Sequence, residues 1–255
     1  MKITRAVVPS LFTVLNIFCG FSSIVHSSSG DFILASWFIL MAGIFDVFDG
    51  LMARITKSSS DFGVEFDSLS DVVSFGAAPA FMVYKLQLQE YEGMGILLSS
   101  MPLIFGALRL ARFNTQLVGY DKEFFKGLPI PASAIIICSF VLTYYQPGGG
   151  LAGIAPSLLV PVIVVVSLLM VSTVRYDTLP KISSRSFKMY PLRFTLGIIG
   201  LTVIVATKGQ AVFPVFVAYV ATGPVRYVVD FIRHALHPSP KDGDEKDSEI
   251  TSVDI

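Results

Sequence analysis

Charge and cysteine are the two things that this sequence has little of. Only 15% of its 255 residues are charged, against about a quarter in a typical soluble domain. The two cysteines, Cys19 and Cys138, both fall inside apolar stretches, which argues against a disulfide and against a Cys/His zinc site. Histidines are also few, and their positions suggest no catalytic role. No nucleic-acid-binding motif is evident, so no nucleic acid partner is expected.

What the chain has in abundance is apolar sequence, at 53% of residues and a mean hydropathy of +0.68. Residues 127–174 contain no Asp, Glu, Lys or Arg. One bilayer crossing needs about 20 apolar residues, so this run can cross twice. The segment QPGGGLAGIAP at 146–156 supplies the turn between the crossings. The pattern predicts an all-α, polytopic membrane helix bundle.

About eight transmembrane helices are expected. They are placed near residues 9–27, 32–54, 64–85, 94–114, 130–146, 157–175, 192–208 and 210–233. Together they form one membrane-embedded domain over residues 1–236. The tail at 237–255 is polar and net acidic, and we expect it to be disordered and cytoplasmic.

The basic residues predict an orientation. If the N-terminus lies inside, all of the 19 Lys and Arg except Lys85 and Lys208 fall on the cytoplasmic side. This positive-inside bias predicts a multi-pass protein of the cell (cytoplasmic) membrane with both termini inside. The loop at 175–193 is basic, and such loops usually contact anionic membrane lipids.

Acidic residues stand where these helices should be apolar. Asp46 and Asp49 are three apart in the second helix, and Asp67 and Asp71 are four apart in the third, so each pair shares one helix face. At about 1.5 Å per residue, Asp46 and Asp71 lie about 21–22 Å from the outer helix ends, and the other two about 27 Å. Two antiparallel neighbours would then aim four carboxylates at one place.

Bare carboxylates in such a place repel one another. Divalent cations remove the repulsion, and oxygen ligands suit Mg²⁺ or Mn²⁺. Two ions bridged by carboxylates serve phosphoryl chemistry, so two divalent ions are expected. A cation transporter and a membrane scaffold with interfacial acids stay open as alternatives. The absence of a second acidic cluster in the later helices argues against a transporter.

The order Asp46-x2-Asp49-Gly50-x2-Ala53-Arg54-x8-Gly63-x3-Asp67-x3-Asp71 resembles the signature of the CDP-alcohol phosphatidyltransferases. The resemblance implies a membrane enzyme with a six-helix catalytic core, commonly a homodimer, that transfers a phosphatidyl group from a CDP-linked lipid to an alcohol and releases CMP. It implies metal binding by Asp46, Asp49 and Asp67. It also implies that Asp71 is the catalytic base and touches metal. The residues implied for the CDP pocket are Asp49, Gly50, Ala53, Arg54 and Gly63.

Three further stretches, at 9–21, 106–114 and 125–134, read PSLFTVLNIFCGF, GALRLARFN and FKGLPIPASA. They resemble the phosphatidylserine synthase branch of that family, which implies CDP-diacylglycerol and L-serine as substrates. Asn16 is a candidate contact to the nucleotide, or else a bond between helices.

Two arginines are candidates for the acceptor or the phosphates, since Arg binds carboxylates as a bidentate fork. Arg109 shares the depth of Asp46 and Asp71, and Arg112 follows one turn later. Compensation of the acids by the two arginines is the alternative. Glycerol 3-phosphate, inositol phosphate and choline stay open as other acceptors.

Overall fold

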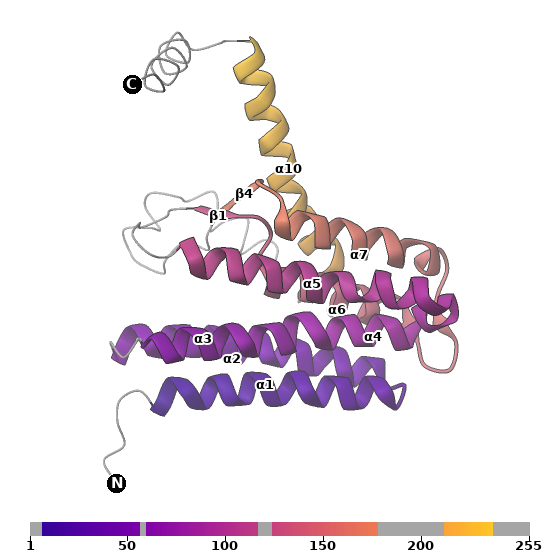
Figure 1. Ribbon diagram of the computed structural model, residues 1–255. Coiled ribbons are helices and arrows are strands. Elements are labelled where there is room, and N and C mark those ends of the chain that lie inside the picture. Colours follow the sequence, from indigo (N-terminus) through magenta and orange to yellow (C-terminus); the bar gives the residue numbers. More distant parts are fainter. Residues whose placement is uncertain (1–6, 57–59, 117–123, 178–211, 237–255) are drawn as a thin grey trace, which may run out of the picture.

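A computed structural model describes residues 7–56, 60–116, 124–177 and 212–236. The described part is mostly helical (Figure 1). Its long helices are α1 (Val7–Ser28), α2 (Phe32–Thr56), α5 (Glu92–Gln116), α6 (Ile130–Tyr144), α7 (Ala155–Val171) and α10 (Val212–Leu236). Between α2 and α5, the chain forms α3 (Asp61–Asp71), the π-helix η1 (Val72–Ala77), α4 (Ala78–Leu86) and the short 3-10 turn η2 (Leu88–Tyr91).

The predicted helices that fall within the described residues are present, with shifted ends. The prediction for 64–85 appears as the consecutive segments α3, η1 and α4. Those for 192–208 and for the tail at 237–255 lie outside the described residues. Within the described ranges, three helical stretches are long and apolar enough to cross a membrane, namely Leu11–Ser28, Phe32–Ala53 and Leu88–Thr115. These are consistent with a multi-pass membrane protein, while eight spans and a six-helix core stay predictions.

Four short strands were not expected from the sequence, because strands of two or three residues show no alternating pattern. Strand β2 (Tyr145–Gln146) pairs with β3 (Gly150–Leu151), which closes the turn that the glycines predict. Gly148 and Gly150 have φ values of +79° and +75°, a conformation that glycine adopts without steric cost. Strand β1 (Phe124–Lys126) pairs with β4 (Arg175–Asp177).

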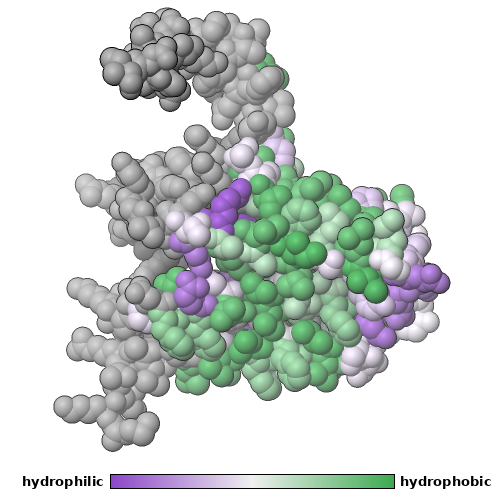
Figure 2. All heavy atoms as spheres, in the orientation of Figure 1, coloured by the Kyte–Doolittle hydropathy of each residue, from purple (hydrophilic) through white to green (hydrophobic). Residues whose placement is uncertain are grey.

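The helices run side by side, with α1 along α2, α4 beside α5, and α7 on the other side of α5 (Figure 1). Apolar side chains fill the interior and also cover the outside. Phe18, Phe21 and Trp37 are 60%, 61% and 56% exposed. Figure 2 shows a broad apolar surface on the face in view, with polar residues at the end where α4 meets α5 and again beside the grey atoms on the opposite side. A surface of this kind is expected where lipid takes the place of water.

The segment after β1 packs against the end of α7. The N–H groups of Gly127 and Leu128 donate to the carbonyl oxygens of Val174 and Leu169 at 2.8 and 2.9 Å. Gly127 has a φ of +82°, and a Cβ there would lie 2.1 Å from the carbonyl oxygen of Met170. Glycine at position 127 is thus needed for the close packing of this segment on the end of α7.

Hydroxyl groups connect α1 to the chain that carries Asp71. Ser70 Oγ donates to the Thr13 carbonyl oxygen at 3.2 Å, and Ser74 Oγ donates to that of Asn16 at 2.9 Å. Gly20 permits the close approach, because a Cβ at this position would lie 2.7 Å from Ser74 Cα. Both cysteines are free and buried in the structure.

Candidate active site

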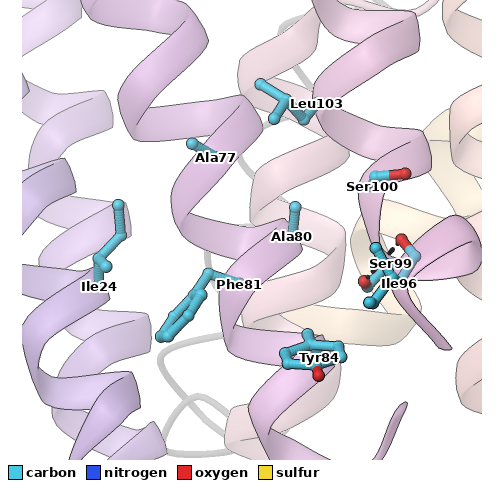
Figure 3. Close-up of a pocket in the computed structure, with 9 residues that line it drawn as sticks. All are labelled: Ile24, Ala77, Ala80, Phe81, Tyr84, Ile96, Ser99, Ser100 and Leu103. Atoms are coloured by element: carbon cyan, nitrogen blue, oxygen red, sulfur yellow. Dashed lines mark hydrogen bonds between the residues drawn. The ribbon is translucent and has the colours of Figure 1, made fainter. Parts of the chain in front are cut away.

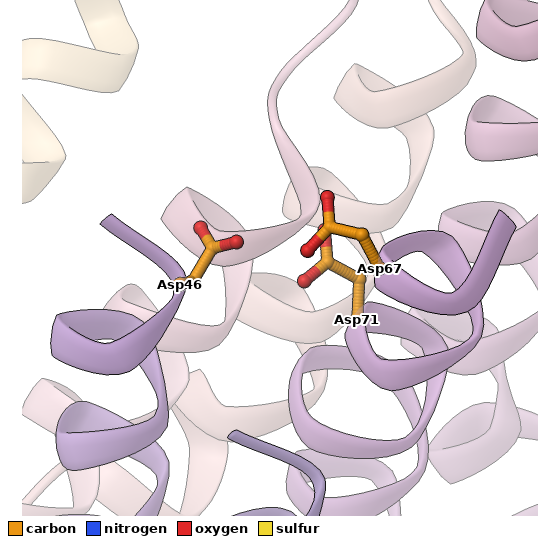
Figure 4. Close-up of side chains that lie close together, drawn as sticks. All are labelled: Asp46, Asp67 and Asp71. Atoms are coloured by element: carbon orange, nitrogen blue, oxygen red, sulfur yellow. The ribbon is translucent and has the colours of Figure 1, made fainter. Parts of the chain in front are cut away.

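Three acidic side chains meet between α2 and α3. Asp46, Asp67 and Asp71 each offer one carboxylate oxygen, and these oxygens all lie within 4.8 Å of one another. Figure 4 shows Asp46 on one helix facing Asp67 and Asp71 on the other. Residues that are 21 to 25 positions apart in the chain thus form one acidic cluster, at the place that the two helix-face patterns predict.

Asp49 lies next to this cluster and differs from the other three. It is only 7% exposed, and its Oδ2 accepts a hydrogen bond from Thr13 Oγ1. Asp49 remains within coulombic range of Asp46 and Asp67. Of the four carboxylates expected at one point, the structure brings Asp46, Asp67 and Asp71 together and places Asp49 beside them. Three converge, and the fourth is held from the side by α1.

Among the described residues, the acids at this site outnumber the cation that lies within coulombic range of Asp71. Asp71 is 8% exposed and lies within coulombic range of Asp46, Asp67 and the Arg109 guanidinium. Asn16 Nδ2 donates to Asp71 Oδ1 at 3.5 Å. The carboxylates of the buried Asp49 and Asp71 and of the half-buried Asp46 and Asp67 outnumber the Arg109 guanidinium, and like charges held together away from water are costly without compensation.

A divalent cation fits this arrangement. The donors are carboxylate oxygens from two helices, which is the ligand type that Mg²⁺ and Mn²⁺ prefer. Asn16 Oδ1 adds a buried oxygen with no hydrogen-bond partner within the described part of the chain. Asp46, Asp67 and Asp71 are the residues best placed to hold such an ion, with Asp49 adjacent.

The small residues of the motif have different surroundings. A Cβ added at Gly50 would meet nothing within 4 Å, so the space beside the acids on α2 is open. Ala53 is half-buried one turn further on. The Gly63 N–H donates to Ser60 Oγ at 3.1 Å, which caps the start of α3. The Arg54 side chain lies outside the described part of the structure.

The two candidate arginines make different contacts. Arg109 is 6% exposed, with its guanidinium carbon 5.8 Å from the centre of the Phe113 ring and near Asp71. Arg112 Nη1 donates to the carbonyl oxygen of Val171 at 3.1 Å. That carbonyl belongs to the last turn of α7, where a cation is favourable. The structure thus places Arg109 at the acids and ties Arg112 to a helix end.

Thr13 is the site residue that reasoning from sequence missed. It is 2% exposed and donates to Asp49. A signal was present in the sequence, because Thr13 precedes Asn16 by three residues and so shares its helix face. A threonine in an apolar helix is common, however, and only the fold shows that an acid lies opposite.

A separate groove lies on α1, α4 and α5, with a cavity volume of about 420 Å³ (Figure 3). Its lining includes Ile24, Phe81 and Leu103, and no acidic side chain contributes to it. The lining also includes Ala77, which follows Asp71 by six residues along the chain. This cavity is not part of the acidic site.

Comparison with known proteins agrees with the geometry. A model of the CDP-alcohol phosphatidyltransferase family matches residues 6–174. A Helicobacter pylori (strain J99) protein named CDP-diacylglycerol–serine O-phosphatidyltransferase is 36% identical over 223 residues, which cover 86% of this chain and 90% of the relative. An archaetidylserine synthase from Methanothermobacter thermautotrophicus is 39% identical over 178 residues, or 69% of this chain and 72% of the relative.

A protein from Methanocaldococcus jannaschii, again named CDP-diacylglycerol–serine O-phosphatidyltransferase, is 36% identical over 195 residues, covering 74% of this chain and 82% of the relative. The matched region contains α2 and α3 with all of the acids described above. These similarities exclude the transporter and scaffold alternatives. With its acidic cluster inside the matched region, the chain belongs to the CDP-alcohol phosphatidyltransferase family of enzymes.

Proposed function

We propose that this enzyme transfers the phosphatidyl group of CDP-diacylglycerol to the hydroxyl of L-serine, which gives phosphatidylserine and CMP. The observation that carries the proposal is the meeting of Asp46, Asp67 and Asp71, with oxygens within 4.8 Å of one another. The names of the relatives, which cover most of the chain, supply serine as the acceptor.

The acids divide into two roles in this proposal. Asp46, Asp49 and Asp67 bind two Mg²⁺ or Mn²⁺ ions, and Asp71 contributes to the same site. When bound, two such ions draw charge from the diphosphate and stabilise the departing CMP. The excess of buried negative charge near Arg109 supports this assignment.

Asp71 is the proposed general base. The serine oxygen attacks the phosphorus that carries the diacylglycerol, the bond from that phosphorus to CMP breaks, and the serine hydroxyl proton passes to Asp71. A carboxylate in hydrogen-bond reach of the attacking hydroxyl can take that proton. The support is positional, because Asp71 belongs to the acidic cluster and also lies within coulombic range of Arg109.

Arg109 is the proposed partner of the serine carboxylate. It is buried beside Asp71, so a small acceptor could place its carboxylate on the guanidinium and its hydroxyl near the base. Arg112 is the weaker candidate because it donates to Val171. The nucleotide is assigned to the open side of α2. Its proposed contacts are Asn16, Asp49, Gly50, Ala53, Arg54 and Gly63.

The proposal extends to cellular placement. The basic residues favour an active site on the cytoplasmic side of the cell membrane, with both termini inside. A homodimer is expected from the family resemblance. The orientation can be tested with single cysteines introduced into the predicted loops and labelled in intact cells and in lysed cells. A cysteine on the cytoplasmic side should react only after lysis.

The decisive experiment measures CMP release by the purified enzyme from CDP-diacylglycerol and a panel of alcohols. L-serine should be used, whereas glycerol 3-phosphate, inositol phosphate and choline should not. EDTA should abolish activity and added Mn²⁺ or Mg²⁺ should restore it. Full activity in excess chelator would contradict the metal site. Turnover of another acceptor without serine would leave a sister enzyme of the same family.

A further inference from the structure

We propose that α1 is the positioning element of the acidic cluster, and that Thr13 and Asn16 hold one carboxylate from each acid-bearing helix in place for the metal ions. The inference rests on the proposed function, because it concerns how the chain arranges those ligands. It gives roles to two side chains that touch the acids rather than the reacting atoms of the substrate.

The geometry of α1 suits this role. Thr13 and Asn16 are three residues apart and so lie on one helix face. Thr13 Oγ1 donates to Asp49 on α2, and Asn16 Nδ2 donates to Asp71 at the end of α3. Both donors are buried, with exposed fractions of 2% and 0%. One turn of α1 therefore bridges the two helices that supply the acids.

The backbone of the same turn is fixed in return. The carbonyl oxygens of Thr13 and Asn16 accept hydrogen bonds from Ser70 Oγ and Ser74 Oγ, at 3.2 and 2.9 Å. Each of the two residues thus donates through its side chain and accepts through its main chain. These reciprocal bonds fix the position of both donors along the axis of α1 relative to Asp71. They also limit sliding of α1 along α3 and η1.

The chemistry explains why such bonds matter. Each donor occupies one oxygen of its carboxylate and leaves the other available to a cation. A hydrogen-bonded ligand also keeps its rotamer when the metal leaves. Loss of an outer-shell partner of this kind typically costs about 10–100-fold in metal affinity or activity.

The test measures Mn²⁺ affinity of the full-length protein in detergent, without lipid substrate, from the free Mn²⁺ signal in electron paramagnetic resonance. Thr13→Val keeps the volume but removes the donor, and Asn16→Leu does the same at the second position. Each should weaken Mn²⁺ binding about 10–100-fold. Thr13→Ser restores a hydroxyl and should bind within about threefold of the wild type, less than the loss expected from removing the donor.

Ser23→Ala is the matched control. Ser23 is buried on the same helix and its hydroxyl has no partner within the described residues, so its removal should leave Mn²⁺ affinity unchanged. Unchanged helical circular dichroism and gel-filtration elution establish folding. Should Thr13→Val fail this check, Thr13→Ala removes the same donor with less crowding from the branched side chain.

The outcomes separate the two proposals. Wild-type affinity in both Thr13→Val and Asn16→Leu would overturn the positioning role while the metal site stands. Unchanged Mn²⁺ affinity in Asn16→Leu, together with a raised KM for CDP-diacylglycerol, would leave Asn16 with its nucleotide contact alone and overturn its positioning role. Absence of Mn²⁺ binding by the wild type would overturn the metal site itself, and the positioning role with it.

Discussion

The helical stretch from α3 to α4 has two halves of opposite character. In the acidic half, defined as α3 with the facing parts of α1 and α2, Ser70 and Asp71 are buried polar residues with interhelical hydrogen bonds. In the apolar half, defined as α4 with the facing parts of α1 and α2, Ala78, Met82 and Val83 are fully buried and apolar. One continuous stretch therefore serves a polar site and a close-packed core.

Helix α1 shows the same difference between a hydrogen-bonded part and an apolar part. Thr13 and Asn16 form hydrogen bonds to the acids in the acidic half. Ser23 and Ser27 in the apolar half are equally buried, but their hydroxyls have no partner within the described residues. Along the described part of α1, the side-chain hydrogen bonds to the acid-bearing helices thus lie where the acids must be held.

The π-helix η1 separates the two halves. A π-turn contains more residues than an α-turn, so it rotates the face that the following helix presents, and such segments are frequent at functional sites. Before η1, the helix directs Asp67 and Asp71 at the acidic cluster. Within it, Phe75 is fully buried in the core. The π-helix thus allows α3 to face the acidic cluster and α4 to face the apolar core.

The largest effect is expected from the acids themselves. Asp71→Asn keeps the shape but removes the proposed base, which should lower kcat about 10²–10⁴-fold. Asp46→Asn, Asp49→Asn and Asp67→Asn should instead weaken Mn²⁺ binding. Steady-state CMP release across Mn²⁺ concentrations separates the two kinds of change. Asp61→Asn, at the start of α3, is the control and should change neither quantity.

Next in size is a change at the boundary between the halves. Gly20→Ala places a Cβ 2.4 Å from Ser74 Oγ and 2.7 Å from Ser74 Cα, so the backbones of α1 and η1 must separate. Overpacking of this kind typically costs about 1–3 kcal/mol. Thermal inactivation in detergent should show the loss.

Gly43→Ala is the control for the boundary variant. Its Cβ would lie 3.8 Å from Phe75 Cε1, an ordinary contact, and alanine favours the helix by about 1 kcal/mol over glycine. Equal stability of the two variants would mean that α1 and η1 tolerate separation, and that the boundary is less constrained than the contacts indicate.

Sequence reasoning reached the acidic cluster because its signal is periodic. Spacings of three and four residues place Asp46 and Asp71 on definite helix faces, and the antiparallel order of α2 and α3 follows from a short connection. Depth counting assumes straight α-helices, however. It gives no sign of the hydrogen bond that Asp49 accepts from Thr13 on a third helix.

Other features were beyond the reach of sequence patterns. η1 has no composition that distinguishes it from an α-turn, so the helix predicted at 64–85 appeared uniform. The strands β1 and β4 pair residues that are about fifty positions apart, and such a pairing depends on how α6 and α7 return the chain. The different partners of Arg109 and Arg112 likewise depend on where α7 ends.

A smaller effect is expected at Arg109. Arg109→Lys retains the charge but loses the planar fork, and the loss of one charge-assisted hydrogen bond corresponds to about tenfold in KM for serine. The KM for CDP-diacylglycerol should change little, because only serine loses its partner. Arg112→Lys is the comparison variant and should affect KM for serine less. Equal increases in both KM values for Arg109→Lys would instead assign that residue to the phosphates.

The smallest expected effect compares a serine of η1, at the edge of the acidic half, with a serine of the apolar half. Ser74→Ala removes a hydroxyl that donates to the Asn16 carbonyl oxygen at 2.9 Å, and loss of such a bond costs about 1 kcal/mol. Ser27→Ala removes a buried hydroxyl that has no partner within the described part of the chain. Because an unpaired buried hydroxyl is itself unfavourable, this change should be neutral or stabilising. Both substitutions remove the same atom from buried helical positions, so side-chain volume and helix propensity change equally. Thermal inactivation midpoints in one detergent should therefore shift down for Ser74→Ala and stay level or rise for Ser27→Ala. A shift of the same sign and size in both would show that hydrogen bonds do not distinguish the acidic half from the apolar half.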